Sequence, residues 1–363
     1  MWPDCDGNLP IHLASSEDHI AVVEILIHSN QNTGAIQNSE KDPEILLPVA
    51  TLVSDQIFAA DSDGSYPLHL ALENDCEKVV PYLLKTCYDY LNGESLFSLV
   101  EQPRKSDNNR PLHIAASQCT LTMVRLLIKY YKAKTNKQNS EQETPLFLAC
   151  KNGKTEIAKY LINYGGSNKE MRDSDSYTPL LIASSWGYHE TVKMLLEEGA
   201  DLDVSDKEEK TAFFIAAQEN VPNVMRVLLN HDSTNRAKLL DLLKASDQNG
   251  NTAYHEAAGR GNIKILKMLL NAEKKVDYKN EDDQTPLHLA SAAGRVKCIR
   301  ILLKADHNLM LDDDADANTA LHLACSGGHE HAVECLIELG AKVNARNTDC
   351  LDEFLENRSE KNF

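Results

Sequence analysis

Apolar residues recur along this chain in short groups with helical spacing. Residues 283–290 read Asp-Gln-Thr-Pro-Leu-His-Leu-Ala. A threonine hydroxyl can cap the first turn of a helix, and a proline presets φ at the first helical position. The leucines and alanine that follow give one short helix an apolar face. Weaker copies of this stretch recur along the whole chain, which indicates a repeat array.

The copies align on the proline, or on the residue that replaces it, at nearly regular intervals. Five of the eight intervals are 33 or 34 residues long, and the other three resemble one period plus an insertion. Each repeat is expected to be a turn followed by two antiparallel helices. The anchors are Pro10, Pro67, Pro111, Pro145, Pro179, Ala212, Ala253, Pro286 and Ala320.

A second helix is predicted in each repeat from apolar residues at i, i+3 and i+4. In the repeat that begins at Asp175, Gly187 ends the first helix, Val192, Leu195 and Leu196 form the apolar face of the second, and Gly199 closes it. Such positions are expected to form core. The same pattern recurs as Val124, Leu127, Ile128; Ile157, Tyr160, Leu161; Ile265, Met268, Leu269; Ile299, Leu302, Leu303; and Val333, Leu336, Ile337.

The Thr-Pro-Leu-His pattern, its interval and its turn residues resemble those of the ankyrin-repeat family. The resemblance covers residues 4 to about 357. It implies an all-α solenoid of about nine to ten helix-turn-helix repeats with inserted loops, forming one array over residues 1–363. The pattern departs at residues 210–214, where proline and histidine are lost, and at residues 221–222, where the glycine between the helices is missing.

Three insertions and an incomplete last repeat interrupt the regularity. Residues 30–61, 86–107 and 231–247 are apolar enough to form packed loops or added helices. Long loops are often functional, but a purely structural role fits equally well. Residues 349–357 resemble the first helix of a tenth repeat with no second helix after it.

Composition and charge narrow the class of protein. The 363 residues carry a formal charge of −18, which argues against nucleic acid as a partner, because phosphate backbones need clustered Lys and Arg. Nine scattered cysteines without a Cys-x-x-Cys pair indicate reduced thiols and a cytoplasmic location. We expect no secretion signal and no membrane span, since the longest apolar run, residues 45–53, is far shorter than the roughly 20 residues required.

Residues that could carry chemistry are assigned structural roles. Six histidines occupy one slot of successive repeats, a slot that serves hydrogen bonding between neighbours in ankyrin repeats: His12, His69, His113, His255, His288 and His322. No metalloprotease, phosphate-loop or nucleophile motif is complete, so no enzyme, cofactor or metal is expected. The aspartates at 312, 313, 314 and 316 are interpreted as a solvated acidic loop, with weak cation binding as the alternative.

Four basic residues and six cysteines are assigned to exposed or buried positions by their place in the repeat. Arg295, Lys297, Arg300 and Lys304 read as a solvent-exposed helix face, with an anionic ligand as the alternative. Cysteines on apolar positions are expected to be buried and inert: Cys150, Cys298, Cys325 and Cys335. Those at the turn between helices are expected to be exposed: Cys76 and Cys119.

A protein-binding surface is expected on the concave side of the stack, at the tips of the loops between repeats and on the first helices. Trp186 is the leading candidate, since exposed tryptophan is enriched at binding hot spots. Packing against the neighbouring repeat is the alternative for this side chain. The other candidates are Tyr177, Lys207, Asn249, Asp282 and Asp316.

Two functions fit these features. Residues 178–183, 285–295 and 320–324, and the irregular intervals, resemble the ankyrin domain of transient receptor potential ankyrin cation channels. That resemblance implies a cytosolic sensor or regulatory region of a channel subunit, usually tetrameric, whose pore lies outside this chain. The alternative is a soluble cytosolic adaptor or scaffold unrelated to a channel.

Overall fold

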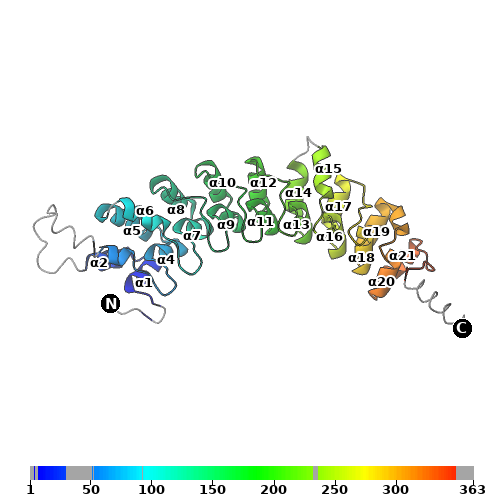
Figure 1. The fold of residues 1–363 in the computed structure, drawn as a ribbon, viewed down its shortest axis with the longest axis horizontal. Coiled ribbons are helices and arrows are strands. Elements are labelled where there is room, and N and C mark those ends of the chain that lie inside the picture. The colour runs from blue at the N-terminus through cyan, green and yellow to red at the C-terminus, as the bar shows by residue number, and fades with distance from the viewer. Residues whose placement is uncertain are drawn as a thin grey trace, which may run out of the picture. The chain divides into compact units, whose positions relative to one another are not determined.

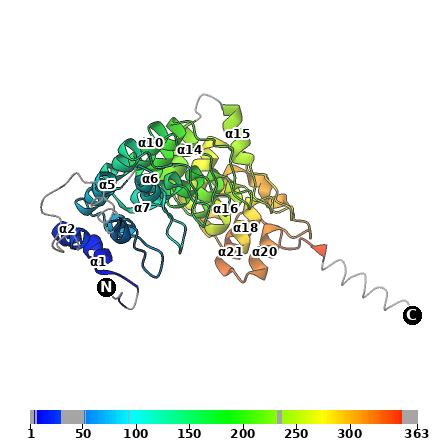
Figure 2. The ribbon, with the colours of Figure 1, turned by 60° about the vertical axis from the view of Figure 1, so that its left-hand side comes forward.

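The computed structural model describes residues 4, 7–29, 51, 53–91, 93–231 and 236–348. The contacts divide the chain into two compact units, Met1–Ser174 and Asp175–Phe363. Within each unit, helices alternate between first and second helices of successive repeats (Figures 1 and 2). Over the described residues, β-structure is confined to isolated bridges, such as that between Ser246 and Thr252. The predicted all-α repeat solenoid is confirmed.

In its described residues, unit 1 contains four helix pairs, with further helical residues outside these pairs. The first helices pack in sequence order, α1 on α4, α4 on α7 and α7 on α9. They are α1 (Pro10–Ser16), α4 (Pro67–Glu73), α7 (Pro111–Gln118) and α9 (Pro145–Lys151). The second helices are α2 (Ile20–His28), α5 (Val79–Tyr90), α8 (Leu121–Arg125), which continues into the π-helix η1 (Leu126–Tyr130), and α10 (Thr155–Asn163).

Unit 2 contains five helix pairs, and both rows pack in sequence order. The first helices are α11 (Pro179–Ser185), α13 (Ala212–Gln218), α16 (Ala253–Arg260), α18 (Pro286–Ala292) and α20 (Ala320–Ser326). The second helices are α12 (His189–Glu197), α14 (Pro222–His231), α17 (Ile263–Ala272), α19 (Val296–Ala305) and α21 (Glu330–Glu338). Two additional elements are α15 (Arg236–Lys244) and the 3₁₀ helix η2 (His307–Leu311).

The apolar faces of the first and second helices together form the core. Val192 and Leu195 are fully buried, as are Ile299 and Leu302. The expectation that Ile337 forms part of the core is wrong, because its side chain is 45% exposed. It lies on α21, the last second helix that the structure describes, and no described second helix follows to cover this face.

The insertions add helices where the structure describes them. In the segment 86–107, helix α6 (Gly93–Glu101) packs against α5 and α7, with Leu99 buried. In the segment 231–247, Leu239, Leu242 and Leu243 of α15 are buried. Residues 30–50 of the first insertion, and the incomplete repeat at 349–357, lie outside the described residues. Among the described helices, none combines the length and apolar character that a bilayer crossing requires.

Candidate interaction surface

The loop between a second helix and the next first helix, here called a finger, is held by one Asp or Asn side chain. Oδ1 of Asp247 accepts hydrogen bonds from the backbone N–H of Asn249 and Asn251, at 3.0 and 2.8 Å. Oδ1 of Asn280 does the same in the next finger. Because a carboxylate and an amide carbonyl are both acceptors, Asp and Asn are interchangeable here. Asp61, Asn139, Asp206 and Asp314 repeat the geometry.

This finger role corrects one interpretation of the acidic segment at 312–316. Asp314 was expected to be solvated, but it is only 9% exposed, because its carboxylate accepts backbone N–H groups inside the finger. Sequence reasoning missed the set of side-chain acceptors that hold the fingers. The available signal was an Asp or Asn five residues before most helix caps, for example Asn280 before Thr285, whereas Lys105 takes that place before Arg110.

Backbone hydrogen bonds join each finger to its neighbour within a unit. In unit 2 the N–H of Glu281 donates to the carbonyl of Asn249 at 3.0 Å, and that of Ala315 to the carbonyl of Asp282 at 3.0 Å. The N–H of Thr348 donates to Asp316 in the same way, also at 3.0 Å. These bonds fix the spacing between successive fingers, so that the tips form a preorganised row.

The predicted finger residues lie along this row. The side chains of Asn249, Asp282 and Asp316 are exposed, while their carbonyls accept the linking hydrogen bonds. Lys207 is also exposed, and its ammonium group lies 2.5 Å from Oδ1 of Asp175. Tyr177 is half-buried, and burial, together with the nearby Asp206 carboxylate, raises the pKa of its hydroxyl. The structure therefore places these five residues on successive fingers of unit 2.

Trp186 lies apart from the finger tips. It caps the carboxyl end of α11, whereas Tyr177 precedes the amino end of the same helix, so that roughly 12 Å of helix separates them at about 1.5 Å per residue. The indole side chain is 59% exposed. Trp186 is therefore not buried, and most of its surface is open to solvent. Its role in binding stays a prediction.

The recurring histidines connect a helix cap to the next finger. Nδ1 of His255 accepts a hydrogen bond from the backbone N–H of Thr252 at 3.1 Å, so the ring hydrogen lies on Nε2. Nε2 then donates to the carbonyl of Gln284 at 2.9 Å. His12, His69, His113 and His322 make the same pair of bonds. His288 keeps the cap bond, but its Nε2 has no partner among the described residues.

Burial keeps the rings of His69, His113 and His255 neutral. Loss of hydration lowers the pKa of His69, His113 and His255 to about 4, even though each ring hydrogen-bonds to backbone carbonyls that favour the charged form. Each imidazole lies on a different repeat. No group of His, Cys, Asp or Glu with metal-binding geometry occurs among the described residues. The assignment of the histidines to structure is supported by these bonds.

The cysteine assignments need three corrections. Cys76 and Cys119 are buried, at 4% and 1% exposure, because each thiol points back to a carbonyl of the preceding repeat, Ser16 and Leu72 respectively. Cys325 is exposed although an apolar position was expected to bury it. Cys150, Cys298 and Cys335 are buried as predicted. Burial raises the pKa of all five buried thiols named here.

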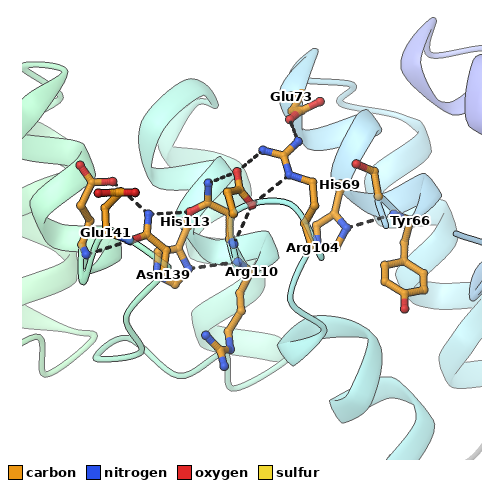
Figure 3. A network of polar contacts seen from close by, with 12 residues as sticks. Tyr66, His69, Glu73, Arg104, Arg110, His113, Asn139 and Glu141 are labelled. Carbon is orange, nitrogen blue, oxygen red and sulfur yellow. Dashed lines mark hydrogen bonds and ion pairs between the residues drawn. The ribbon is translucent and has the colours of Figure 1, made fainter. Parts of the chain in front are cut away.

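A polar network in unit 1 was not anticipated from the sequence. The Arg104 guanidinium bridges the carboxylates of Glu73 and Asp107, which belong to neighbouring repeats (Figure 3). Burial opposes ionisation of Asp107, but hydrogen bonds from Arg104 and Asn109 hold the pKa of its carboxyl below the usual value. Arg104 lies within the finger before α7, where its backbone N–H donates to the carbonyl of Asn109. Periodicity gave no sign of the network, because its ion pairs join neighbouring repeats.

The basic residues of α19 do not converge on one ligand site. Arg295 donates from Nε to the carbonyl of Gly259 at 3.1 Å, on the preceding repeat. Arg300 instead pairs with Glu338 of α21, with 2.8 Å between nitrogen and oxygen. The interpretation as an exposed helix face agrees with this geometry.

Comparison with known proteins finds a matching family and a protein that is similar to part of this chain. A family model of ankyrin repeats in three copies matches residues 35–139, 112–206, 198–282 and 272–347, and a single ankyrin-repeat model matches residues 6–38. The chain is also similar to a transient receptor potential cation channel subfamily A member 1 homolog from Caenorhabditis elegans, with 28% identity over 102 residues. That alignment covers 28% of this chain and 8% of the relative.

The family models together extend over most of the sequence, and their matches coincide with the helix pairs, finger loops and histidine slots described above. The chain belongs to the ankyrin-repeat family.

Proposed function

We propose that this chain is the cytosolic ankyrin-repeat region of a transient receptor potential ankyrin-type cation channel. In this role it is not an enzyme and acts by binding other proteins. The partial similarity to the channel homolog from Caenorhabditis elegans supports the channel assignment. The alignment covers only 8% of that protein, so the channel activity is part of the proposal and does not follow from the alignment itself.

The finger row of unit 2 is the surface that we assign to protein binding. Exposed side chains recur at Asn249, Asp282 and Asp316, and backbone hydrogen bonds hold their spacing before any partner arrives. Preorganisation reduces the entropy lost on association. The exposed indole of Trp186 supplies a large apolar contact at the other end of α11. This preorganised, exposed row is the observation that carries the proposal.

A soluble cytosolic adaptor is the second candidate. The ankyrin family match favours it as much as it favours a channel, because one fold hosts many functions. The two candidates differ in what surrounds the repeats in the native gene product and in where that product resides.

Fractionation of the native product separates the two. An antibody raised against residues 1–363 is used to probe cytosolic and carbonate-washed membrane fractions of the source cells. A channel subunit is expected in the membrane fraction, with a mass well above the 40.4 kDa of this chain, and crosslinking is expected to yield a tetramer. Recovery in the cytosolic fraction would reject the channel assignment and support the adaptor.

A further inference from the structure

One repeat of this acidic chain contains no acidic residue. The chain has 55 Asp and Glu residues in 363, so about five are expected in a stretch of 33 residues. The 33 residues between Asp107 and Glu141 contain none. The same stretch carries six basic residues, Arg110, Arg125, Lys129, Lys132, Lys134 and Lys137. A local excess of positive charge therefore stands within a chain of net charge −18.

Four of these lysines lie together at the end of the second helix of this repeat. Lys129 belongs to η1, and Lys132, Lys134 and Lys137 follow on the loop to the next finger. The last three line an open surface depression of about 510 Å³. All four side chains are exposed. We call these four residues the lysine loop.

No carboxylate of the described residues forms an ion pair with the lysine loop. Some exposed lysines elsewhere do have such partners, as Lys207 has Asp175 and Lys238 has Asp203. Unpaired like charges in one loop repel each other and create a local positive potential. Lys129 lies over the ring of Tyr130 and Lys134 over that of Phe97, and the Glu101 carboxylate accepts a hydrogen bond from the backbone N–H of Lys134. An anionic partner would neutralise the remaining positive potential of the loop.

An apolar groove lies beside the lysine loop, between α5 and α8 with η1. Its apolar lining is Pro81, Met123, Leu126 and Tyr130, and the polar residues Glu77, Thr122 and Arg125 complete it, over a volume of about 370 Å³. The Tyr130 side chain is 67% exposed. The groove is bordered by a π-helical turn, and such turns are frequent at functional sites. Tyr130 belongs to the groove and lies two residues before Lys132, so the apolar and basic surfaces adjoin along the chain.

The aromatic surface continues onto α10. The Arg125 guanidinium, which also lines the groove, lies 5.4 Å from the ring centre of Tyr160. Tyr160 in turn stacks on Tyr164, with ring centres 5.0 Å apart, and Tyr164 is 75% exposed. Exposed tyrosine and arginine side chains are those enriched in protein interfaces.

We propose that the groove and the lysine loop together dock an acidic peptide segment of a partner protein. Its carboxylates pair with Lys129, Lys132, Lys134 and Lys137, and a bulky apolar side chain enters the groove beside Tyr130. A membrane or an extended nucleic acid fits less well, because its negative charge extends far beyond one repeat. It would then meet the acidic residues at both ends of the basic stretch, Asp107 and Glu141. The binding surface lies in unit 1 and is distinct from the finger row of unit 2.

The test measures peptide binding to the full chain by fluorescence anisotropy. The probe is a fluorescein-labelled 14-residue peptide of Asp and Glu around a central Leu-Phe pair. One matched peptide replaces every Asp and Glu by Asn and Gln, and a second replaces Leu-Phe by Ser-Ser. We expect the all-amide peptide to bind at least tenfold more weakly, and the Ser-Ser peptide about fivefold more weakly. The Kd of the acidic peptide should also rise steeply with salt concentration.

Variants of the lysine loop and of the groove, compared with a control variant elsewhere, locate the binding surface. Lys132→Gln, Lys134→Gln and Lys137→Gln combined should raise the Kd at least tenfold, and Tyr130→Ser should raise it several-fold. The control combines Lys264→Gln, Lys267→Gln and Lys304→Gln, three exposed lysines of unit 2, and should change the Kd less than twofold. Unfolding midpoints measured for every variant separate lost binding from lost structure, since all seven side chains are exposed.

Three results would overturn the proposal. One is equal affinity for the acidic and the all-amide peptides. Another is an equal change of the Kd in the lysine-loop variant and in the control variant. The third is tighter binding, through the same lysines, to phosphatidylserine vesicles or to a 15-residue oligothymidylate than to the acidic peptide, which would assign the surface to a membrane or to nucleic acid.

Discussion

At the scale of single residues, the slot three residues after each helix cap determines how a repeat is linked to the next. Where the slot holds histidine, as at His255, the ring joins its own cap to a carbonyl of the next finger. Where it holds Phe147, Leu181 or Phe214, the threonine hydroxyl of the cap accepts the helix N–H instead. The same fold thus accepts a polar or an apolar residue in this slot.

Replacing His255 by Phe should make stability less sensitive to acid. The folded-state pKa of His255 is about 4, below the ordinary value of about 6.5, so its contribution to stability is complete above pH 6.5 and is lost as pH falls towards 4. Between these two pH values, each such histidine lowers the free energy of unfolding by about 1.4 kcal/mol for every unit by which the pH falls. Urea unfolding measures how much the free energy of unfolding drops from pH 6 to pH 5. This drop should be smaller by about 1 kcal/mol in His255→Phe than in wild type.

The control for this change is His331→Gln, because His331 is an exposed residue outside the slot. It should reproduce the wild-type dependence on pH. An acid sensitivity of His255→Phe equal to that of wild type would show that the buried ring does not titrate as described.

Thiol exposure gives a second prediction at this scale. In the folded protein, maleimide should label Cys325 within minutes, while Cys119 and Cys150 stay unlabelled until urea is added, because both are buried and burial raises the pKa of their thiols. Peptide mass spectrometry assigns the labelled sites. Labelling of Cys119 at the rate of Cys325 in the native protein would contradict the packing of the turn between α7 and α8.

At the scale of structural elements, the finger depends on one side-chain acceptor. Asp247→Ala removes two hydrogen bonds to backbone N–H groups in a finger where that side chain is buried, and should lower the free energy of unfolding by about 2 kcal/mol. Asp247→Asn should cost less than about 0.5 kcal/mol, since Asn139 and Asn280 fill the same position in other fingers. Equal losses in the two variants would show that the acceptor role does not stabilise the finger.

The helix pairs could be predicted from the sequence because their burial follows a period. Val192, Leu195 and Leu196 lie on one helix face by spacing alone, and all three are buried. The position of a residue relative to a neighbouring repeat could not be predicted in this way. Cys119 was assigned to the surface because it follows a helix, but the preceding repeat covers it through the carbonyl of Leu72. Exposure at a turn depends on what packs over it, which spacing does not encode.

The candidate site was predicted only in outline. The finger tips at Asn249, Asp282 and Asp316 could be located because each precedes a cap by a fixed number of residues. The bonds that hold the tips in a row could not, because they join backbone groups, which no side-chain pattern reports. The Arg104 network was missed for a related reason, since it depends on tertiary contacts between neighbouring repeats.

At the scale of the whole molecule, stability should be local, because helices of each unit pack on the next repeats along the chain. Leu195→Ala leaves a cavity in a fully buried position of α12 and should cost about 3 kcal/mol. Hydrogen exchange should accelerate in α11, α12 and the neighbouring α14, while the amides of α4 and α5 in unit 1 keep wild-type protection. Uniform acceleration across both units would instead indicate a single cooperative core.

Protein binding through the finger row of unit 2 is the central claim, and one affinity measurement tests it directly. A partner captured by the wild-type chain is purified, and its Kd is measured for wild type, for the combined variant Asn249→Ala, Asp282→Ala and Asp316→Ala, and for Trp186→Ala. A control combines Glu197→Ala, Lys264→Ala and Glu334→Ala, which are exposed on second helices.

We predict at least a tenfold rise in Kd for the finger variant and for Trp186→Ala, with unfolding midpoints unchanged and the control within twofold of wild type. A Kd that stays at the wild-type value in both the finger variant and Trp186→Ala would contradict the account.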